Sequence, residues 1–129
     1  MAFTLTRMPG YPGVVITGTG EGSLEESDEI IRVLEREAAV APFRGLVLDV
    51  RYLEYIPTPE EARRIGATYG AFGAAHRVAM AYLALPGAQY GVARMVQILS
   101  EGHGVRAGVF TSFEPALNWL FSDVQAQGA

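Results

Sequence analysis

Residues 45–50 read GLVLDV, a nearly continuous apolar run that is typical of a central strand covered on both faces. A helix start follows it, because Thr58 suits an N-cap, Pro59 suits the first turn and Glu61 suits the partner position of a capping box. The apolar residues that come next have helical spacing: Ala62, Ile65, Tyr69 and Phe72. A buried strand followed by an amphipathic helix indicates an α/β fold with parallel strands.

The same alternation continues to the end of the chain. RVAMAYLAL at 77–85 predicts a second buried strand, and a helix that stops near Gly102 follows it. The apolar positions of that helix are Val92, Met95, Val96 and Leu99. VRAGVF at 105–110 predicts a third strand, and residues 112–121 predict a short helix.

The start of the chain departs from this alternation. Residues 3–8 and 13–18 flank MPGYPG and predict a β-hairpin. Ser23 and Glu26 then predict a capping box for a helix that ends at about Val40. The predicted order is therefore β-β-α-β-α-β-α-β-α. We expect an α/β sandwich whose mixed sheet has an N-terminal hairpin and mostly parallel central strands.

The chain has 129 residues, which suits one domain, predicted at 1–122 with a short polar tail at 123–129. The net charge is −4 and the ten basic residues are scattered arginines, so we do not expect nucleic-acid binding. Lysine and cysteine are both absent, which excludes Schiff-base chemistry, a P-loop lysine and thiol-ligated metals. No apolar run is long enough for a membrane span, and the first residues lack the pattern of a signal peptide. We therefore expect a bacterial-type cytoplasmic protein.

Reactive groups are sparse in the sequence. His76 and His103 are the only histidines, each at a predicted helix end, and their spacing fits neither a metal site nor a catalytic base. Asp49 stands near a strand end, where a short acid commonly accepts bonds from backbone N–H groups of the next loop. We predict no catalytic residues, no cofactor and no metal site, and hence no enzyme.

The segment GLVLDVRYLEYIPTPEEARRIG, within this element order, resembles the STAS superfamily, the domain shared by sulfate-transporter tails and anti-sigma-factor antagonists. In that family a hydrophobic strand ends in Asp and a short apolar loop leads to an Asp-Ser pair at a helix start. The residues that match the strand are Leu46, Val47, Leu48, Asp49 and Val50. The resemblance implies a regulatory module that acts through protein contacts.

The resemblance places Thr58 at the position of the phosphorylated serine, which makes it a phosphoacceptor candidate. Pro57, Pro59 and Glu60 stand where the family has its Asp, its small residue and its Gly. A phosphate on Thr58 would gain from the helix dipole, but Glu60 and Glu61 would repel it. The alternative role for Thr58 is that of a helix cap, and a cap can also be modified.

We expect the partner surface at residues 51–63, the edge where STAS domains usually meet partners. Its candidate residues form an aromatic and charged group: Tyr52, Glu54, Tyr55, Glu60 and Arg63. The alternative is that Tyr55 or Ile56 turns inward as a hydrophobic staple. The partner is another protein or a second copy of the chain in a homodimer.

The closing stretch VFTSFEPALNWL is similar to a STAS-like branch that is grouped with the lipid-transfer domain SEC14. That similarity implies an alternative function, a carrier of a small apolar ligand. Its pocket would lie between the sheet and the helices and would measure roughly several hundred cubic ångströms. The predicted lining residues are Tyr69, Phe72, Tyr82 and Met95.

Overall fold

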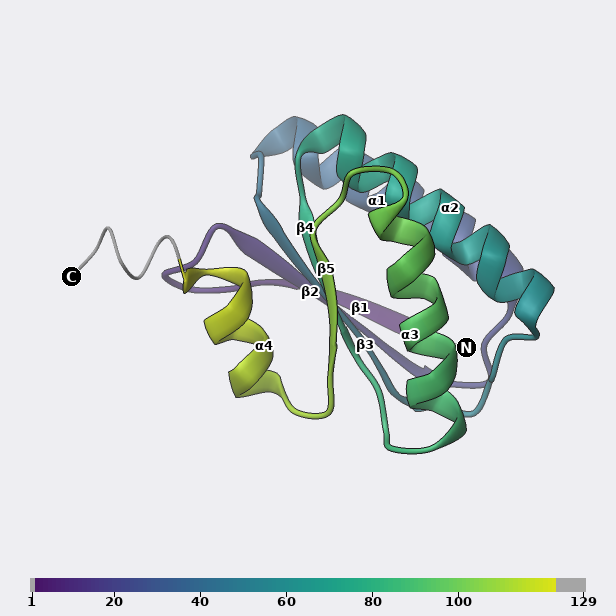
Figure 1. The fold of residues 1–129 in the computed structure, drawn as a ribbon. Helices are drawn as coiled ribbons and strands as arrows, with labels where there is room; N and C mark the ends of the chain where they lie inside the picture. Colours follow the sequence, from purple (N-terminus) through teal and green to yellow (C-terminus); the bar gives the residue numbers. More distant parts are fainter. Residues whose placement is uncertain (1, 123–129) are drawn as a thin grey trace.

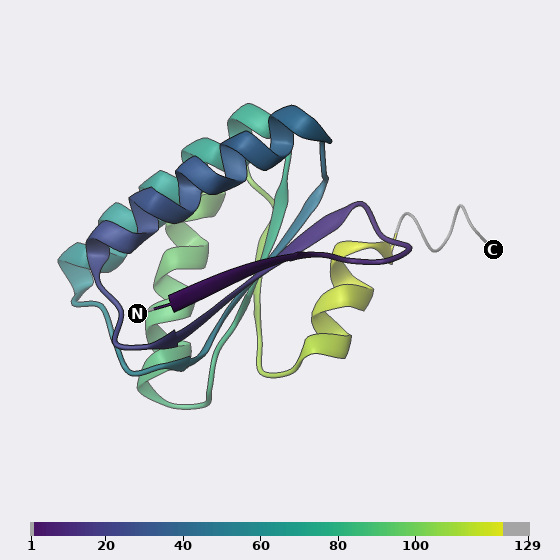
Figure 2. The same ribbon diagram turned by 180° about the vertical axis from the view of Figure 1, so that it is seen from behind.

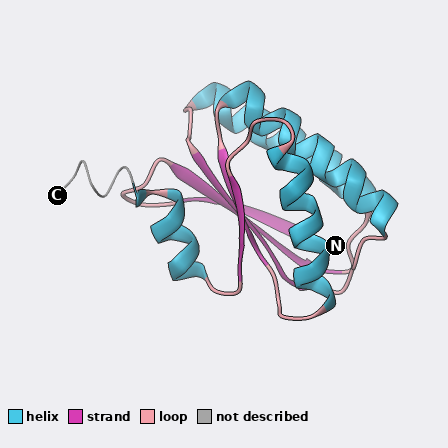
Figure 3. Cartoon of the chain, in the orientation of Figure 1, coloured by secondary structure: helices cyan, strands magenta, loops and turns pink. Residues whose placement is uncertain are grey.

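A computed structural model describes residues 2–122, which form one five-stranded sheet with four helices (Figure 3). The strands lie side by side in chain order: β1 (Ala2–Arg7), β2 (Gly13–Gly20), β3 (Gly45–Leu53), β4 (Ala79–Leu83) and β5 (Ala107–Phe110). The β1–β2 pair is antiparallel and the other three pairs are parallel. The predicted element order and the mixed sheet are confirmed. The tail predicted at 123–129 lies outside the described residues.

The helices cover the two faces of the sheet unequally. One face carries α1 (Leu24–Val40), α2 (Pro59–His76) and α3 (Ala88–Glu101), as Figures 1 and 2 show from opposite sides. The other face carries α4 (Phe113–Leu120) alone. Both faces of the central strands are therefore buried, which explains the continuous apolar run in β3. None of the described helices is long and apolar enough to cross a membrane.

The pleat of β3 divides its side chains between two cores. Leu46 and Leu48 join the larger core under α1, α2 and α3, whereas Val47 joins the smaller core under α4. The smaller core also holds Phe121, whose ring lies over the paired glycines Gly13 and Gly45. A Cβ atom at either glycine would lie within 2.6 Å of that ring. The Phe121 ring therefore fits against the sheet only because both positions are glycine.

Helix α2 approaches α3 closely because glycine, which has no side chain, occupies the contact positions. A Cβ atom at Gly66 would lie 2.6 Å from the Leu99 Cβ and 3.2 Å from the Val96 carbonyl oxygen. One turn later, Gly70 would meet the His103 ring in the same way. The two helices therefore pack at a separation that only glycine allows at these positions.

The two predicted capping boxes have different outcomes. At α2 the Thr58 hydroxyl accepts from the Glu61 backbone N–H, and the Glu61 carboxylate accepts from the Thr58 backbone N–H, as predicted. At α1 the prediction is wrong, since the Ser23 hydroxyl accepts no backbone bond. It donates instead to the Glu26 carboxylate at 3.3 Å, and this side-chain contact replaces the cap.

Candidate functional site

Strand β3 contains an irregularity that shapes the site. Its register with β2 runs from Thr17 opposite Asp49 to Thr19 opposite Tyr52, so β3 advances three residues while β2 advances two. One extra residue in a strand reverses the direction in which the following side chains point. Leu53 consequently packs on Gly18 at the face that carries α1, α2 and α3, while Tyr52 points outward and is 59% exposed.

Two side chains bond to backbone groups beside this bulge. The Asp49 carboxylate accepts from the Arg51 backbone N–H at 3.1 Å and from the Arg51 guanidinium in two bonds of 2.9 Å. The Gln89 amide donates to the Val50 carbonyl oxygen at 2.8 Å and accepts from the Leu85 backbone N–H at 2.6 Å. Asp49 therefore has the backbone partner predicted for it, and Gln89, which the sequence did not single out, ties the ends of β3 and β4 together.

The Asp49–Arg51 pair is a largely buried ion pair. Only 7% of the Asp49 side chain and 21% of the Arg51 side chain are exposed. The hydrogen bond to Asp49 raises the pKa of Arg51 further above its ordinary range. Removing the guanidinium would leave a buried carboxylate with a single backbone donor.

The start of α2 presents its capping groups to solvent. The Thr58 hydroxyl lies 3.2 Å from the Glu61 nitrogen, and the Glu61 carboxylate lies 3.0 Å from the Thr58 nitrogen. The bond from the Thr58 backbone N–H is the largest cause that lowers the pKa of Glu61 below its ordinary 4.5. Next to it, Glu60 pairs with Arg63 at 3.0 Å, and both side chains are well exposed.

The lowered pKa of Glu61 predicts a pH dependence of stability. Because the folded pKa lies below the unfolded one, the stabilising contribution is present above that ordinary value and is lost as the pH falls through the folded value. A Glu61→Gln variant lacks the contribution from the start, so its melting temperature should approach that of the unaltered chain as the pH falls from about 7 to about 3.

The control for this prediction is Glu60→Gln, which removes a carboxylate from the same turn but leaves the cap intact. Its melting-temperature difference from the unaltered chain should vary less between the same two pH values. If both variants show the same pH dependence, then the cap is not the origin of the effect of Glu61.

Of the predicted partner residues, the structure exposes all but Tyr55. Tyr52 and Glu54 point outward at the end of β3, and Glu60 and Arg63 point outward from the first turn of α2. The Tyr55 ring is instead turned inward and packs on Gly22, ahead of α1. Its neighbour Ile56 is the exposed residue, with 50% of its side chain accessible.

The Tyr55 hydroxyl is buried and has no hydrogen-bond partner within normal geometry among the described residues. Burial raises the pKa of this phenol to about 12, and the nearby Glu61 carboxylate is the second cause. At neutral pH the group therefore stays protonated. Tyr55 contributes to packing under the connection between β3 and α2 and is not a surface contact.

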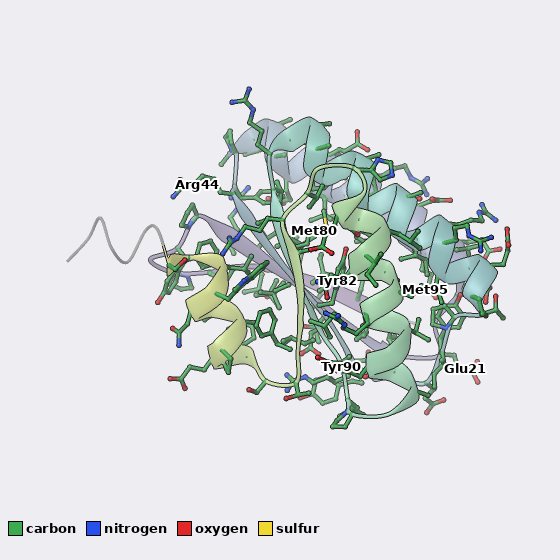
Figure 4. All side chains as sticks on the ribbon, in the orientation of Figure 1. Glu21, Arg44, Met80, Tyr82, Tyr90 and Met95 are labelled. Atoms are coloured by element: carbon green, nitrogen blue, oxygen red, sulfur yellow. The ribbon has the colours of Figure 1, made fainter. Side chains whose placement is uncertain are left out.

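A cavity of about 100 Å³ lies between the sheet and the three helices, close to this connection, and is smaller than the carrier alternative predicts. The predicted pocket residues Tyr69 and Tyr82 line it. Phe72 does not, since its ring is buried against Phe43 and His76. Met95 does not line the cavity either. It is 38% exposed on the outer side of α3, whereas Tyr82 lies between the sheet and that helix (Figure 4).

The error at Met95 has a physical reason. The apolar residues of α3 extend around more than half of the helix, so spacing alone does not fix which of them face inward. The inward stripe consists of Ala93, Val96, Gln97 and Ser100.

Within residues 2–122, the side chains of His, Asp and Glu form no group of three or more that could hold a metal ion.

No family model matches the sequence, and no curated protein matches it. Solved structures do match it along nearly its full length. An RsbS variant from Moorella thermoacetica with a serine-to-glutamate change matches with a TM-score of 0.63 and 14% identity, over 97% of this chain and 99% of that chain. An anti-sigma factor antagonist from Mycobacterium paratuberculosis matches with a TM-score of 0.61 and 15% identity, over 92% of each chain.

A third structure names the fold. It is an uncharacterized protein of the DUF3478 family from Shewanella loihica PV-4, described as having a SpoIIAA-like fold. It matches with a TM-score of 0.58 and 17% identity, over 92% of each chain. The chain has this STAS-like fold. The resemblance seen in GLVLDVRYLEYIPTPEEARRIG is thereby confirmed at the level of fold, since identities this low carry no activity from one chain to another.

Within the STAS-like fold, Thr58 has two alternative roles, that of a helix cap and that of a phosphoacceptor. The resemblance places Thr58 at the phosphorylated residue, and the structure gives its hydroxyl a capping bond at the exposed start of α2. A phosphate there would lie next to Glu60 and would displace the reciprocal bond with Glu61. The contacts on the described residues therefore support the cap, and Thr58 as a phosphoacceptor stays a prediction.

Proposed function

We propose that the chain is a non-catalytic regulatory module of the cytoplasm that binds a protein partner through its β3–α2 surface. We define this surface as Tyr52, Glu54, Ile56, Glu60 and Arg63. The observation that carries the proposal is the exposure of two large apolar side chains, Tyr52 at 59% and Ile56 at 50%, on either side of an acidic residue. Aromatic and aliphatic side chains in such a polar rim are typical anchors of protein interfaces.

The backbone under the β3–α2 surface is held in place, which suits a recognition site. The Asp49–Arg51 pair fixes the bulge, and the Arg51 guanidinium lies 5.4 Å from the centre of the Tyr52 ring. Gln89 links Leu85 to β3, and Leu85 adds a third half-exposed apolar side chain near the same end of the sheet. A pre-organised patch of this kind binds a partner with less loss of conformational entropy.

The acidic residues of the surface indicate the charge of its partner. Glu54 is exposed and its backbone bonds to Gly20, next to Glu21, while Glu60 pairs with Arg63. Glu21 lies far from Arg44, which is at the other end of the molecule (Figure 4). We therefore expect basic side chains around the apolar contacts of the partner. The shared fold of the anti-sigma factor antagonist and of RsbS supports a regulatory role of this kind.

The test places a photo-crosslinker, p-benzoylphenylalanine, at Ile56 in the source cells. Val40 serves as the matched control position, because it is an apolar residue with 84% exposure at the end of α1. We expect one discrete crosslinked product from position 56 and none of that mass from position 40. A product with twice the mass of the chain would assign the surface to a homodimer.

The same products from both positions, or none from position 56, would contradict the proposed partner surface.

A further inference from the structure

We infer that the cavity beside the β3–α2 connection is a binding site for a small neutral apolar molecule. The inference does not depend on the proposed protein partner. The cavity lies between the sheet and helices α1, α2 and α3, and its apolar walls come from all of them, with Ile16, Leu48, Ile65 and Val96 among the lining residues. Such a site between a sheet and its helices is enclosed by the rigid part of the fold.

The polar side chains that line the cavity are largely engaged within the protein. Asp49 is held by Arg51, and both ends of the Gln89 amide bond to backbone groups. The Tyr82 hydroxyl lies 2.8 Å from the Ser100 hydroxyl and 3.4 Å from the Met80 sulfur. The Tyr55 hydroxyl is the exception, because it is buried without a partner among the described residues. A ligand with several polar groups would bury most of them without partners.

The charges of the lining residues restrict the ligand further. Among the described residues that line the cavity, Glu26 and Asp49 are acidic and none is basic. Arg51 already neutralises Asp49, and no described lining residue offers a cation to a ligand, so carboxylates, phosphates and nucleotides do not fit. The apolar walls favour a hydrocarbon group.

The volume sets the size of the ligand. An apolar cavity of roughly 150 Å³ holds a benzene molecule, and this cavity has about 100 Å³. It is also partly open, with Ile56 and Val92 lining it while keeping part of their surface accessible. The enclosed space is therefore smaller than a benzene site, so a ligand places a short alkyl group or one edge of a ring inside and the rest at the opening.

The probe for this site is toluene, and its matched control is benzoate, which adds a charge to the same ring. Methyl NMR spectra of the full chain should show saturable shifts with toluene at the lining residues Ile16, Leu48 and Val96. Benzoate should bind at least about 100-fold more weakly, because its carboxylate would be buried without a cation. Toluene should also raise the melting temperature, since it binds the folded state alone.

Variants decide whether the shifts arise in the cavity. Ala93→Leu adds carbon atoms at a lining position and should lower toluene affinity at least about tenfold. Ala67→Leu makes the same change at an exposed position of α2 and should leave toluene binding unchanged. If Ala93→Leu does not fold, then Val92→Phe replaces it, because Val92 is a half-buried lining residue at the opening.

Three results would overturn the inference: no saturable shift with toluene, equal binding of benzoate, or toluene binding that Ala93→Leu and Val92→Phe both leave intact. Ile56 lines the cavity and also belongs to the β3–α2 surface, so the toluene tests use cavity variants in α3 and leave Ile56 unaltered.

Discussion

Replacing Arg51 with methionine is expected to lower the free energy of unfolding by about 1–3 kcal/mol, the cost typical of leaving a buried polar group without its partner. The change removes two side-chain bonds to Asp49, whose carboxylate stays buried with only the Arg51 backbone N–H as a donor. It also releases the bulge that turns Tyr52 outward. Urea unfolding followed by circular dichroism at neutral pH measures the loss.

The matched control is Arg63→Met, which breaks the ion pair with Glu60 on the surface. Since 65% and 75% of these two side chains are exposed, the loss should be at most about 1 kcal/mol. Combining Arg51→Met with Asp49→Asn should recover part of the lost stability, because the carboxylate is then absent. Equal losses from Arg51→Met and Arg63→Met would show that the buried pair does not hold the bulge.

A valine at Gly66 is expected to lower the free energy of unfolding by about 2–3 kcal/mol through overpacking. Its Cβ would lie 2.6 Å from the Leu99 Cβ, an atom next to the α3 backbone that rotation of a side chain does not move. Helices α2 and α3 would have to separate. The measurement is thermal and urea unfolding of the variant.

Ala67→Val is the control for Gly66→Val, because residue 67 is the exposed neighbour on the same helix. It should cost less than about 1 kcal/mol, the helix propensity difference between alanine and valine. A Gly66→Val variant as stable as the unaltered chain would mean that the close approach of α2 and α3 is not required for the fold.

The fold could be predicted from the sequence because its signals are local. The capping box of Thr58 and Glu61 involves residues three apart, and the apolar run at 45–50 has to be covered on both faces. Each pattern fixes one element, and the order of elements then leaves few topologies. Local signals are not always sufficient. The capping box predicted at Ser23 does not form, because the Ser23 hydroxyl bonds to the Glu26 side chain instead of the backbone.

The details of the site could not be predicted, because they depend on pairing between distant segments. The bulge in β3 exists only relative to β2, and it decides that Tyr52 lies in a strand and points outward. The Gln89–Val50 bond joins residues 39 positions apart. The rotation of α3 follows from its packing on α2, which places Ala93 inward and Met95 outward.

The central claim is that the β3–α2 surface recognises a protein through its apolar side chains, while Thr58 serves the helix as a cap. The affinity of the crosslinked partner for three variants, Ile56→Asp, Thr58→Val and Thr58→Glu, tests it most directly. We expect Ile56→Asp to weaken binding at least about tenfold, as loss of an interface anchor does. Both Thr58 variants should bind like the unaltered chain, with Thr58→Val about 1 kcal/mol less stable. Full binding by Ile56→Asp together with loss of binding by Thr58→Glu would contradict the account.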